Sequence, residues 1–593
     1  MSLLTDFRNV MIKNVYSAYL IATSDFHNSE YIPAYFKTRE FLTGFTGSAG
    51  TLLITEDNAY LWVDGRYFIQ AEKQVDTKEI TIMKMGQPNV PTLTEFISKN
   101  LIENSILGFD GRTINAALIN DIKKATNDSI AFEHNNDLIN LVWNDRPPLP
   151  YSLLYKLDDY YTGETYQEKV NKIRLAMANE GCSTHVLASL EDQAWLYNLR
   201  ANDIEHTPDF LSFTVITENQ TLLFIDENKI SPEVKDYLDE QNIIIKPYLG
   251  IFEYAKELKD NNILLNSKSV NYSLYTILAK NNTIVDKQNP SLYLKSIKNQ
   301  TEIKNTKKAH IKDGIAFTKF MYYAKTKYAE GYSLDEISLS NKIQELRCQQ
   351  RGFIDISFNT ICAFKDHGAM MHYSATPESN YKISENGLLL IDSGGHYLNG
   401  TTDITRTIVM GKASDKMKVH YTTVVKSIIR LSKAVFLSGC TGQNLDILAR
   451  GPIWDLGIDY KCGTGHGVGH LLSVHEAPNG FRWQIVPERN DSHKLEPGMI
   501  TTNEPGIYLE GSYGIRIENE LLCVEKEQNE FGNFLAFETI TYAPIDLDAI
   551  KPSLLSKDER EWLNEYHKVV YDKISPSLTD EEKAWLETYT RSI

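Results

Sequence analysis

The chain has 593 residues, a hydrophobic content of 42% and a formal net charge of −17. One hydrophobic core does not grow to that size, so we expect about three domains. The acidic charge argues against nucleic acid and anionic membrane as partners, because both are bound through patches of Lys and Arg.

The N-terminus and the cysteines indicate a cytoplasmic protein. The opening segment MSLLTDFRNV carries charges and lacks the apolar core of a targeting peptide. The chain has no run of about 18 apolar residues that would span a bilayer. Its six cysteines are scattered without a CxxC pair, which is typical of free thiols in a reducing compartment.

The first half contains a faint internal duplication. Residues 52–64 (LLITEDNAYLWVD) and 214–226 (TVITENQTLLFID) have the same pattern of strand, acidic turn and strand. Upstream of each, residues 18–25 (AYLIATSD) and 185–192 (HVLASLED) also resemble one another. The repetition predicts two copies of one α/β module.

Breaks in the pattern divide the chain. The segment NDRPPLP at residues 144–150 breaks helices and strands, and a helix is predicted at 166–180. The second module ends near residue 290, and residues 294–327 have the spacing of two amphipathic helices. We therefore expect domains at residues 1–157, 158–293 and 294–593.

The last third carries five potential metal ligands, each beside Gly or Pro or at the end of an apolar run. They are Asp392 (LLLIDSGG), Asp403 (GTTDITRT), His466 (CGTGHGVGH), Glu504 (TTNEPGIY) and Glu518 (GIRIENE). The two aspartates are expected on paired strands joined by a long loop, and the two glutamates repeat that arrangement. Any one of the five alone would be interpreted as a turn residue, but the set predicts a metal site.

Four carboxylates and one imidazole form a hard, oxygen-rich ligand set. A structural zinc site would instead be expected to use Cys and His. The set suits two divalent ions that share carboxylates, an arrangement that converts water to hydroxide for hydrolysis.

These motifs resemble the aminopeptidase P branch of the creatinase-like, or pita-bread, metallopeptidases. The matching motifs are DSG-x8-D, GTGHG-x-G, VHE-x-P, EPG-x-Y and G-x-RIEN. The resemblance implies an α/β (α+β) protein: two creatinase-like N-terminal modules, then a catalytic pita-bread domain with a C-terminal extension. It also implies a homodimer and two metal ions, manganese by family habit, held by Asp392, Asp403, His466, Glu504 and Glu518.

The resemblance extends to catalytic residues. Glu504 is implied as proton acceptor, and His372 (MMHYSATPE) and His475 (SVHEAP) as groups that stabilise the tetrahedral intermediate. Arg516, two residues before Glu518 on an alternating strand, is expected to orient ligands or substrate. Cys462 stands where many relatives carry histidine, either as a small filler or as a soft ligand. A filler is favoured, because hard metals gain little from thiolate.

The implied activity is release of the N-terminal residue from peptides with proline in second position, with a metal-bridging hydroxide as nucleophile. Prolidase would use the same ligands on dipeptides only, and two N-terminal modules favour the enzyme for longer substrates. Creatine amidinohydrolase has the fold without metals, and the full ligand set argues against it. A non-catalytic pita-bread module that binds peptides or histones is the alternative of another class. Candidate walls of a proline pocket are Phe364, Tyr373 and Tyr397.

Overall fold

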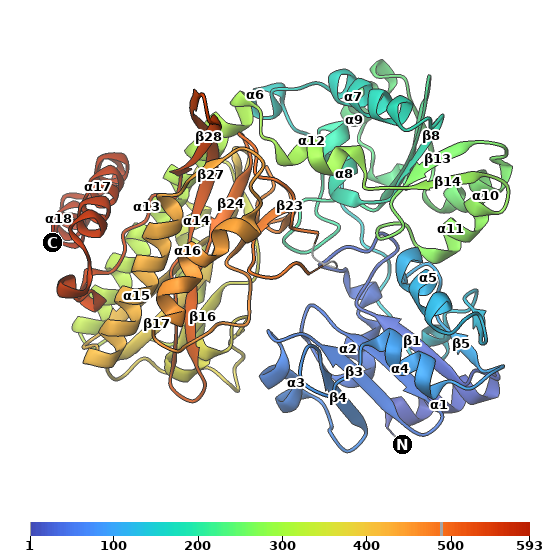
Figure 1. Cartoon of the computed structure of the whole chain (residues 1–593), viewed down its shortest axis with the longest axis horizontal. Coiled ribbons are helices and arrows are strands. Elements are labelled where there is room, and N and C mark those ends of the chain that lie inside the picture. The colour runs from blue at the N-terminus through green and yellow to red at the C-terminus, as the bar shows by residue number, and fades with distance from the viewer. Residues whose placement is uncertain (1, 487–489) are drawn as a thin grey trace. The chain divides into compact units, whose positions relative to one another are not determined.

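The computed structural model describes residues 2–486 and 490–593, which form two compact units. The N-terminal unit comprises the residues up to Leu157 together with Glu164–Ser291, and the C-terminal unit comprises Asp158–Gly163 with Leu292–Ile593. Figure 1 shows the helices and strands of both. All five predicted metal ligands belong to the C-terminal unit.

A mixed six-stranded sheet forms the first half of the N-terminal unit. Its order is β4-β3-β2-β1-β5-β6, in which β3, β2 and β1 are antiparallel neighbours and the other pairs are parallel. The strands are β1 (Ala18–Ala22), β2 (Thr51–Thr55), β3 (Ala59–Val63), β4 (Ile80–Lys84), β5 (Ile106–Gly108) and β6 (Ala131–Glu133). The helices are α1 (Leu3–Lys13), α2 (Thr38–Thr43), α3 (Phe68–Gln74), α4 (Leu93–Asn100) and α5 (Ala116–Ala125).

A second sheet repeats this arrangement strand for strand. Its order is β12-β11-β10-β8-β13-β14, with the same succession of parallel and antiparallel neighbours. The strands are β8 (Thr184–Leu187), β10 (Ser212–Thr217), β11 (Thr221–Ile225), β12 (Ile243–Pro247), β13 (Asn262–Leu265) and β14 (Thr283–Asp286), and β7 (Tyr155–Lys156) pairs with β9 (Leu199–Arg200). The helices are α7 (Tyr166–Asn179), α8 (Leu190–Tyr197), α9 (Pro232–Glu240), α10 (Ile251–Glu257) and α11 (Tyr272–Ala279). The predicted duplication is confirmed.

Antiparallel sheets and the helices packed on them make up the C-terminal unit (Figure 1). The sheet orders are β16-β17-β20, β21-β28-β27-β24-β22-β23, β15-β18-β19 and β25-β26. The strands are β15 (Phe353–Ile356), β16 (Ile361–Phe364), β17 (Gly387–Ser393), β18 (Gly395–Tyr397), β19 (Gly400–Thr401), β20 (Ile404–Met410), β21 (Val435–Leu437), β22 (Gly465–Gly467), β23 (Glu476–Phe481), β24 (Ile500–Asn503), β25 (Gly506–Leu509), β26 (Tyr513–Arg516), β27 (Asn519–Asn529) and β28 (Gly532–Thr539). The helices are α6 (Asp159–Thr162), α12 (Pro290–Ser296), α13 (Gln300–Ala329), α14 (Glu336–Cys348), α15 (Asp415–Ser432), α16 (Gly442–Trp454), α17 (Lys557–Ile574) and α18 (Asp580–Tyr589).

Local signals explain where the main helices begin. Helix α7 starts after Thr165, whose backbone N–H donates to the Glu168 carboxylate in a capping box. Asn299 and Glu302 cap α13 in the same way. The two helices predicted at residues 294–327 are therefore present as α12 and α13, with different ends.

Helix α13 has 30 residues, and its buried side chains are spread from Glu302 to Ala324. Its Asp313 accepts two hydrogen bonds from Arg347 of α14, at 2.6 and 3.0 Å. A Cβ on Gly314 would lie 2.2 Å from the Tyr542 carbonyl oxygen, so only glycine allows that close approach. The helix thus joins segments that are far apart in the sequence.

The core of the C-terminal unit lies beneath the strands that carry the predicted ligands. Apolar residues of α15, among them Tyr421 and Val424, pack in one cluster with Ile507 of β25 and Ile515 of β26. Burying each such side chain contributes about 1.5–3 kcal/mol. The boundaries of the three expected domains stay a prediction, because the two N-terminal modules lie in one compact unit. Within the described residues, no helix combines the length and apolarity needed to span a bilayer.

Candidate metal centre

Two pairs of strands bring the predicted ligands together. Strands β17 and β20 are antiparallel, with Asp392 opposite Thr405, so the predicted pairing of the aspartate strands is confirmed. Glu504 follows β24 and Glu518 precedes β27, and these two strands also pair. The backbone N–H of Glu518 donates to the Thr405 carbonyl at 3.0 Å, which joins the two pairs of strands.

Asp403, His466 and Glu518 form a cluster whose potential ligand atoms all lie within 4.8 Å of one another. Nε2 of His466 lies 3.6 Å from Oδ2 of Asp403 and 3.5 Å from Oε1 of Glu504. Nδ1 of His466 lies 2.9 Å from the Gly467 carbonyl oxygen, to which it donates as N–H. The lone pair of Nε2 therefore faces the carboxylates, as metal ligation requires.

Each of three carboxylates keeps one buried oxygen that has no hydrogen-bond partner among the described residues. These oxygens are Oδ1 of Asp392, Oδ1 of Asp403 and Oε1 of Glu518. An unpartnered buried polar atom costs free energy, and a carboxylate costs most. Divalent cations would satisfy all three oxygens, so the residues fit the two metal ions implied by the sequence.

The remaining carboxylate oxygens are oriented by neighbours. Oδ2 of Asp392 accepts a hydrogen bond from the Arg516 guanidinium, and Oε2 of Glu518 accepts one from the Thr405 hydroxyl at 2.7 Å. Arg516 also donates to the Tyr508 hydroxyl at 2.8 Å. The geometry agrees with an orienting role for Arg516, since its guanidinium is buried against a predicted ligand.

Burial and mutual repulsion raise the pKa values of the acids. Burial is the largest cause for Asp403 and Glu518, whose pKa values lie well above the ordinary range, and the neighbouring carboxylates add to it. Burial also raises the pKa of Glu504 to about 7, against an opposing effect of Arg516. Divalent cations would reverse this effect, because positive charge favours the ionised carboxylates.

Of the two predicted histidines, His475 lies beside the cluster, and the position of His372 at the site stays a prediction. The ring of His475 meets that of His466 edge to face, with centroids 4.3 Å apart. His372 is partly exposed, in the segment between β16 and β17. The Cys462 thiol has its pKa raised to about 11, chiefly by burial and then by Glu504. A protonated thiol is a poor ligand, which favours the filler interpretation.

Two further residues, which the motifs do not include, support the site. Glu520 accepts a hydrogen bond from the backbone N–H of Asp403 at 2.8 Å, and its other oxygen lies 3.0 Å from Nε2 of the fully buried His310. Strand alternation places Glu520 on the same face as Glu518, which is the signal that could have revealed it. His310 lies on α13 and gives no such signal.

Two candidate walls of a proline pocket are corrected by the structure. Phe364 is 1% exposed and Tyr397 is fully buried, so neither lines an open pocket. Phe364 belongs to an apolar core, and Tyr397 donates a hydrogen bond to Asp313 at 2.7 Å.

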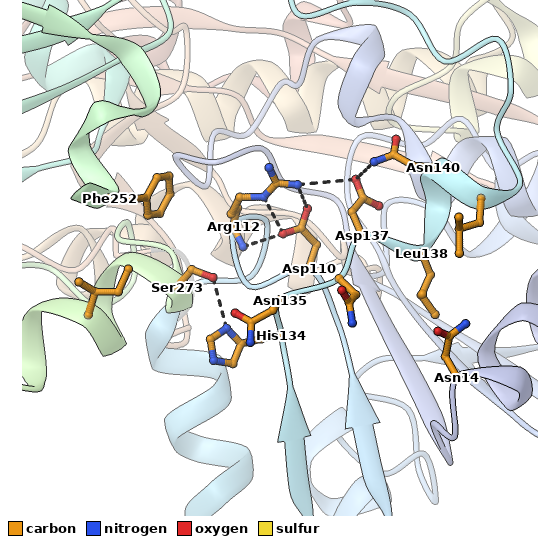
Figure 2. A pocket seen from close by; sticks show the side chains of 13 residues that line it. Asn14, Asp110, Arg112, His134, Asn135, Asp137, Leu138, Asn140, Phe252 and Ser273 are labelled. Atoms are coloured by element: carbon orange, nitrogen blue, oxygen red, sulfur yellow. Dashed lines mark hydrogen bonds and ion pairs between the residues drawn. The ribbon is translucent and has the colours of Figure 1, made fainter. Parts of the chain in front are cut away.

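A separate cavity of about 530 Å³ lies in the N-terminal unit (Figure 2). Arg112 donates to both oxygens of Asp110, at 3.0 and 2.9 Å, and its guanidinium lies 3.8 Å from Asp137. Asparagine side chains make up much of the remaining lining. The cavity shares no residue with the predicted metal site.

Family models match most of the chain. Residues 304–525 match metallopeptidase family M24, and residues 533–593 match the C-terminal region of that family. Residues 4–140 and 145–302 match two models of the creatinase/prolidase N-terminal domain.

Curated relatives align over nearly the full length. The chain is 36% identical to the probable Xaa-Pro aminopeptidase P of Laccaria bicolor, over 98% of this chain and 92% of that protein. It is 34% identical to aminopeptidase P2 of Arabidopsis thaliana, over 97% of this chain and 86% of that protein.

Solved structures give the same relationship. The crystal structure of X-prolyl aminopeptidase from Caenorhabditis elegans, described as a cytosolic enzyme with a di-nuclear active site, matches with a TM-score of 0.94 and 31% identity. The match covers 100% of this chain and 99% of the Caenorhabditis elegans chain. The Xaa-Pro dipeptidase of Bacillus anthracis matches with a TM-score of 0.52 and 26% identity, over 65% of this chain and 99% of that one. The fold class expected from the sequence is confirmed.

Proposed function

We infer the function from the family: the chain belongs to metallopeptidase family M24, among relatives named Xaa-Pro aminopeptidase P. It is a hydrolase that removes the N-terminal residue from peptides with proline in the second position. The observation that carries this proposal is the acid cluster with three unpartnered buried oxygens, on a chain that aligns end to end with an X-prolyl aminopeptidase. The binding-module alternative is disfavoured, since such a module would not need this costly cluster.

The ligands proposed for two divalent ions are Asp392, Asp403, His466, Glu504 and Glu518. When bound, the two ions would supply Lewis-acid activation of water and of the scissile carbonyl. Manganese is proposed because a hard, carboxylate-rich set suits it, whereas intrinsic affinity would not select it. Metal analysis of the purified protein, followed by reloading with single metals, tests this choice.

Each of the predicted catalytic residues then has a separate role in hydrolysis. Glu504 takes a proton from the attacking water and returns it to the proline nitrogen as that nitrogen leaves. The imidazoles of His372 and His475 donate hydrogen bonds to the carbonyl oxygen as it becomes negative. Arg516 keeps Asp392 oriented, and the acidic cluster attracts the free α-amine of the peptide, which limits cleavage to the first bond.

Three peptides separate the candidate activities. The protein is stripped of metal, reloaded with Mn²⁺ and given Arg-Pro-Pro, Gly-Pro and Ala-Ala-Ala. We expect cleavage of the Arg–Pro bond with Gly-Pro largely spared. Strong cleavage of Gly-Pro would move the assignment to prolidase, and no cleavage despite two bound metals per chain would revive the peptide- or histone-binding module.

We also propose a cytoplasmic homodimer. The C-terminal unit exposes two tryptophans in contact: Trp454 and Trp483 are 40% and 43% exposed, with ring centroids 5.9 Å apart. Exposed aromatic pairs of this kind are typical of interfaces. Light scattering after size exclusion is expected to give twice the chain mass, and the Trp454→Ser/Trp483→Ser variant is expected to shift toward one chain mass.

A further inference from the structure

A buried glutamate from α14 ties down the segment between β16 and β17. Glu336 is the first residue of α14 and is fully buried. Its carboxylate accepts hydrogen bonds from the backbone N–H groups of Phe364 at 2.7 Å and Tyr381 at 2.8 Å. It also accepts from Nδ1 of His367 at 2.9 Å and from the Tyr373 hydroxyl at 3.0 Å.

The hydrogen bonding of Glu336 differs from that of the predicted ligands. A carboxylate offers about four acceptor positions, and Glu336 has donors for all of them. Its position in the first turn of a helix further stabilises the negative charge. Glu336 therefore has no need of a cation and serves as an anchor within the protein.

Ring stacking adds a second layer to this anchor. The ring of His367 lies between those of Tyr381 and Tyr373, with centroid distances of 3.6 and 4.2 Å and interplanar angles of 19° and 28°. The three rings come from different turns of one irregular segment. Their stacking and the shared carboxylate fix that segment as a unit.

The segment is also packed directly on β26. A Cβ on Gly514 would lie 1.7 Å from the Gly368 carbonyl oxygen, so the two backbones are in contact with no room for a side chain. Arg516, at the end of the same strand, donates to the Met371 carbonyl at 3.4 Å. The segment is thus held against the strand that orients Asp392.

His372 lies between two of these fixed residues. Met371, before it, contacts Arg516, and Tyr373, after it, contacts Glu336. The backbone on both sides of His372 is therefore held in place from two directions.

We propose that Glu336 is a positioning residue that acts through Tyr373 to hold His372 where its imidazole meets the scissile carbonyl. The inference rests on the proposed function for the role of His372. Preorganised donors stabilise developing charge without reorganisation, so loosening the anchor lowers turnover. No predicted metal ligand hydrogen-bonds to Glu336, so metal binding stays intact.

Tyr373→Phe tests this proposal in the full-length, manganese-loaded protein. The change removes the hydroxyl, which contacts Ser379 at 3.1 Å as well as Glu336 at 3.0 Å, and keeps the ring stacked on His367. We expect kcat for Arg-Pro-Pro to fall about tenfold, with KM within about twofold and Mn²⁺ stoichiometry unchanged. Tyr421→Phe is the matched control: it removes a buried hydroxyl that accepts from the Asp546 N–H at 3.1 Å, and kcat is expected to stay unchanged.

A double-mutant cycle with His372→Ala separates positioning from general loosening. If Tyr373 acts through His372, Tyr373→Phe causes no further loss of kcat in the His372→Ala background. An equal loss in both backgrounds would overturn the proposal, and so would a His372→Ala variant with unchanged kcat. Glu336→Gln is measured alongside as the stronger change, and Tyr373→Phe decides the matter if that variant does not fold.

Hydrogen exchange distinguishes failure of this inference from failure of the proposed function. If the wild-type protein cleaves no peptide, the proposed function fails, and the anchor is judged by amide exchange at residues 370–381. Faster exchange in Tyr373→Phe than in Tyr421→Phe would support the anchor. Unchanged exchange would overturn it.

Discussion

Two acidic clusters in this protein balance their charge in opposite ways. Beside the cavity of the N-terminal unit, Asp110 is paired with Arg112 (Figure 2), and Asp137 is paired with Arg146. In the predicted metal centre, four carboxylates share one arginine, and three of their buried oxygens have no hydrogen-bond partner in the part of the chain that the structure describes. Breaking a matched pair destabilises a fold, whereas unmatched buried acids cost free energy and are candidates for a cation site. The two clusters therefore differ in the pairing of their acids more than in burial.

Removing an unmatched acid is expected to have the largest effect on activity. Asp403→Asn should lower kcat/KM at least about 10³-fold and reduce bound metal, because a ligand charge is lost. The metal-free protein should become more stable, since repulsion among the carboxylates falls. Peptide cleavage, metal analysis and urea unfolding measure these effects.

The matched control for that variant is Asp110→Asn, at a paired acid in the N-terminal unit. It is expected to lower stability and to leave kcat/KM unchanged. The comparison between clusters would be wrong if Asp403→Asn destabilised the metal-free protein as much as Asp110→Asn does.

Breaking a matched pair should affect stability alone. Arg146 donates to Asp137 at 2.5 Å, and both side chains are 6% exposed. Arg146→Met leaves the buried Asp137 carboxylate with only the more distant Arg112 guanidinium, at 3.8 Å, and should lower the free energy of unfolding by about 3 kcal/mol. Urea unfolding checks the loss, and unchanged kcat for Arg-Pro-Pro checks that the metal centre is unaffected.

The residues that orient ligands are expected to have an intermediate effect. Glu520→Gln weakens the contact with His310 and the hydrogen bond from the Asp403 backbone. Affinity for Mn²⁺ should fall about 10- to 100-fold, as is typical when a partner of a metal ligand is lost. Titration calorimetry measures the affinity, and an unchanged value would limit Glu520 to a packing role.

The unmatched acids should also make the metal-free protein sensitive to pH. The pKa of Glu504 is about 7 in the folded state and near 4.5 when unperturbed, so the folded protein binds more protons between these values. The free energy of unfolding should therefore fall as pH rises from about 4.5 to about 7, by on the order of 2 kcal/mol from this group. Urea unfolding in EDTA at several pH values measures the slope.

Two further measurements tie that slope to its cause. Glu504→Gln should reduce the slope, because the substituted side chain does not titrate, and the part that remains should come from Asp403 and Glu518. Saturating Mn²⁺ should also remove it, because the cation favours the ionised acids. If the free energy of unfolding still depends on pH in the Glu504→Gln variant saturated with Mn²⁺, groups outside the acid cluster must cause that dependence.

Features with local signals could be predicted from the sequence. The hairpins at residues 52–64 and 214–226 carry their own turns and alternation, and so revealed the duplication. Asp392 and Glu518 were recognisable because each ends or interrupts a strand next to glycine or an alternating run. Glu336 and His310 were not recognisable, because their partners lie on elements distant in sequence. Tyr397 was misjudged for the same reason: its burial depends on Asp313 of α13.

The length of α13 affects how the C-terminal unit unfolds. At about 1.5 Å per residue its 30 residues form a rod about 45 Å long. His310, Asp313 and Gly314 of this rod contact three different partners within little more than one turn. We expect the amides there to open only when all three contacts are lost together. Their exchange with solvent should therefore require complete unfolding of the unit. It should be slower than the exchange of amides in the loops around the predicted metal centre.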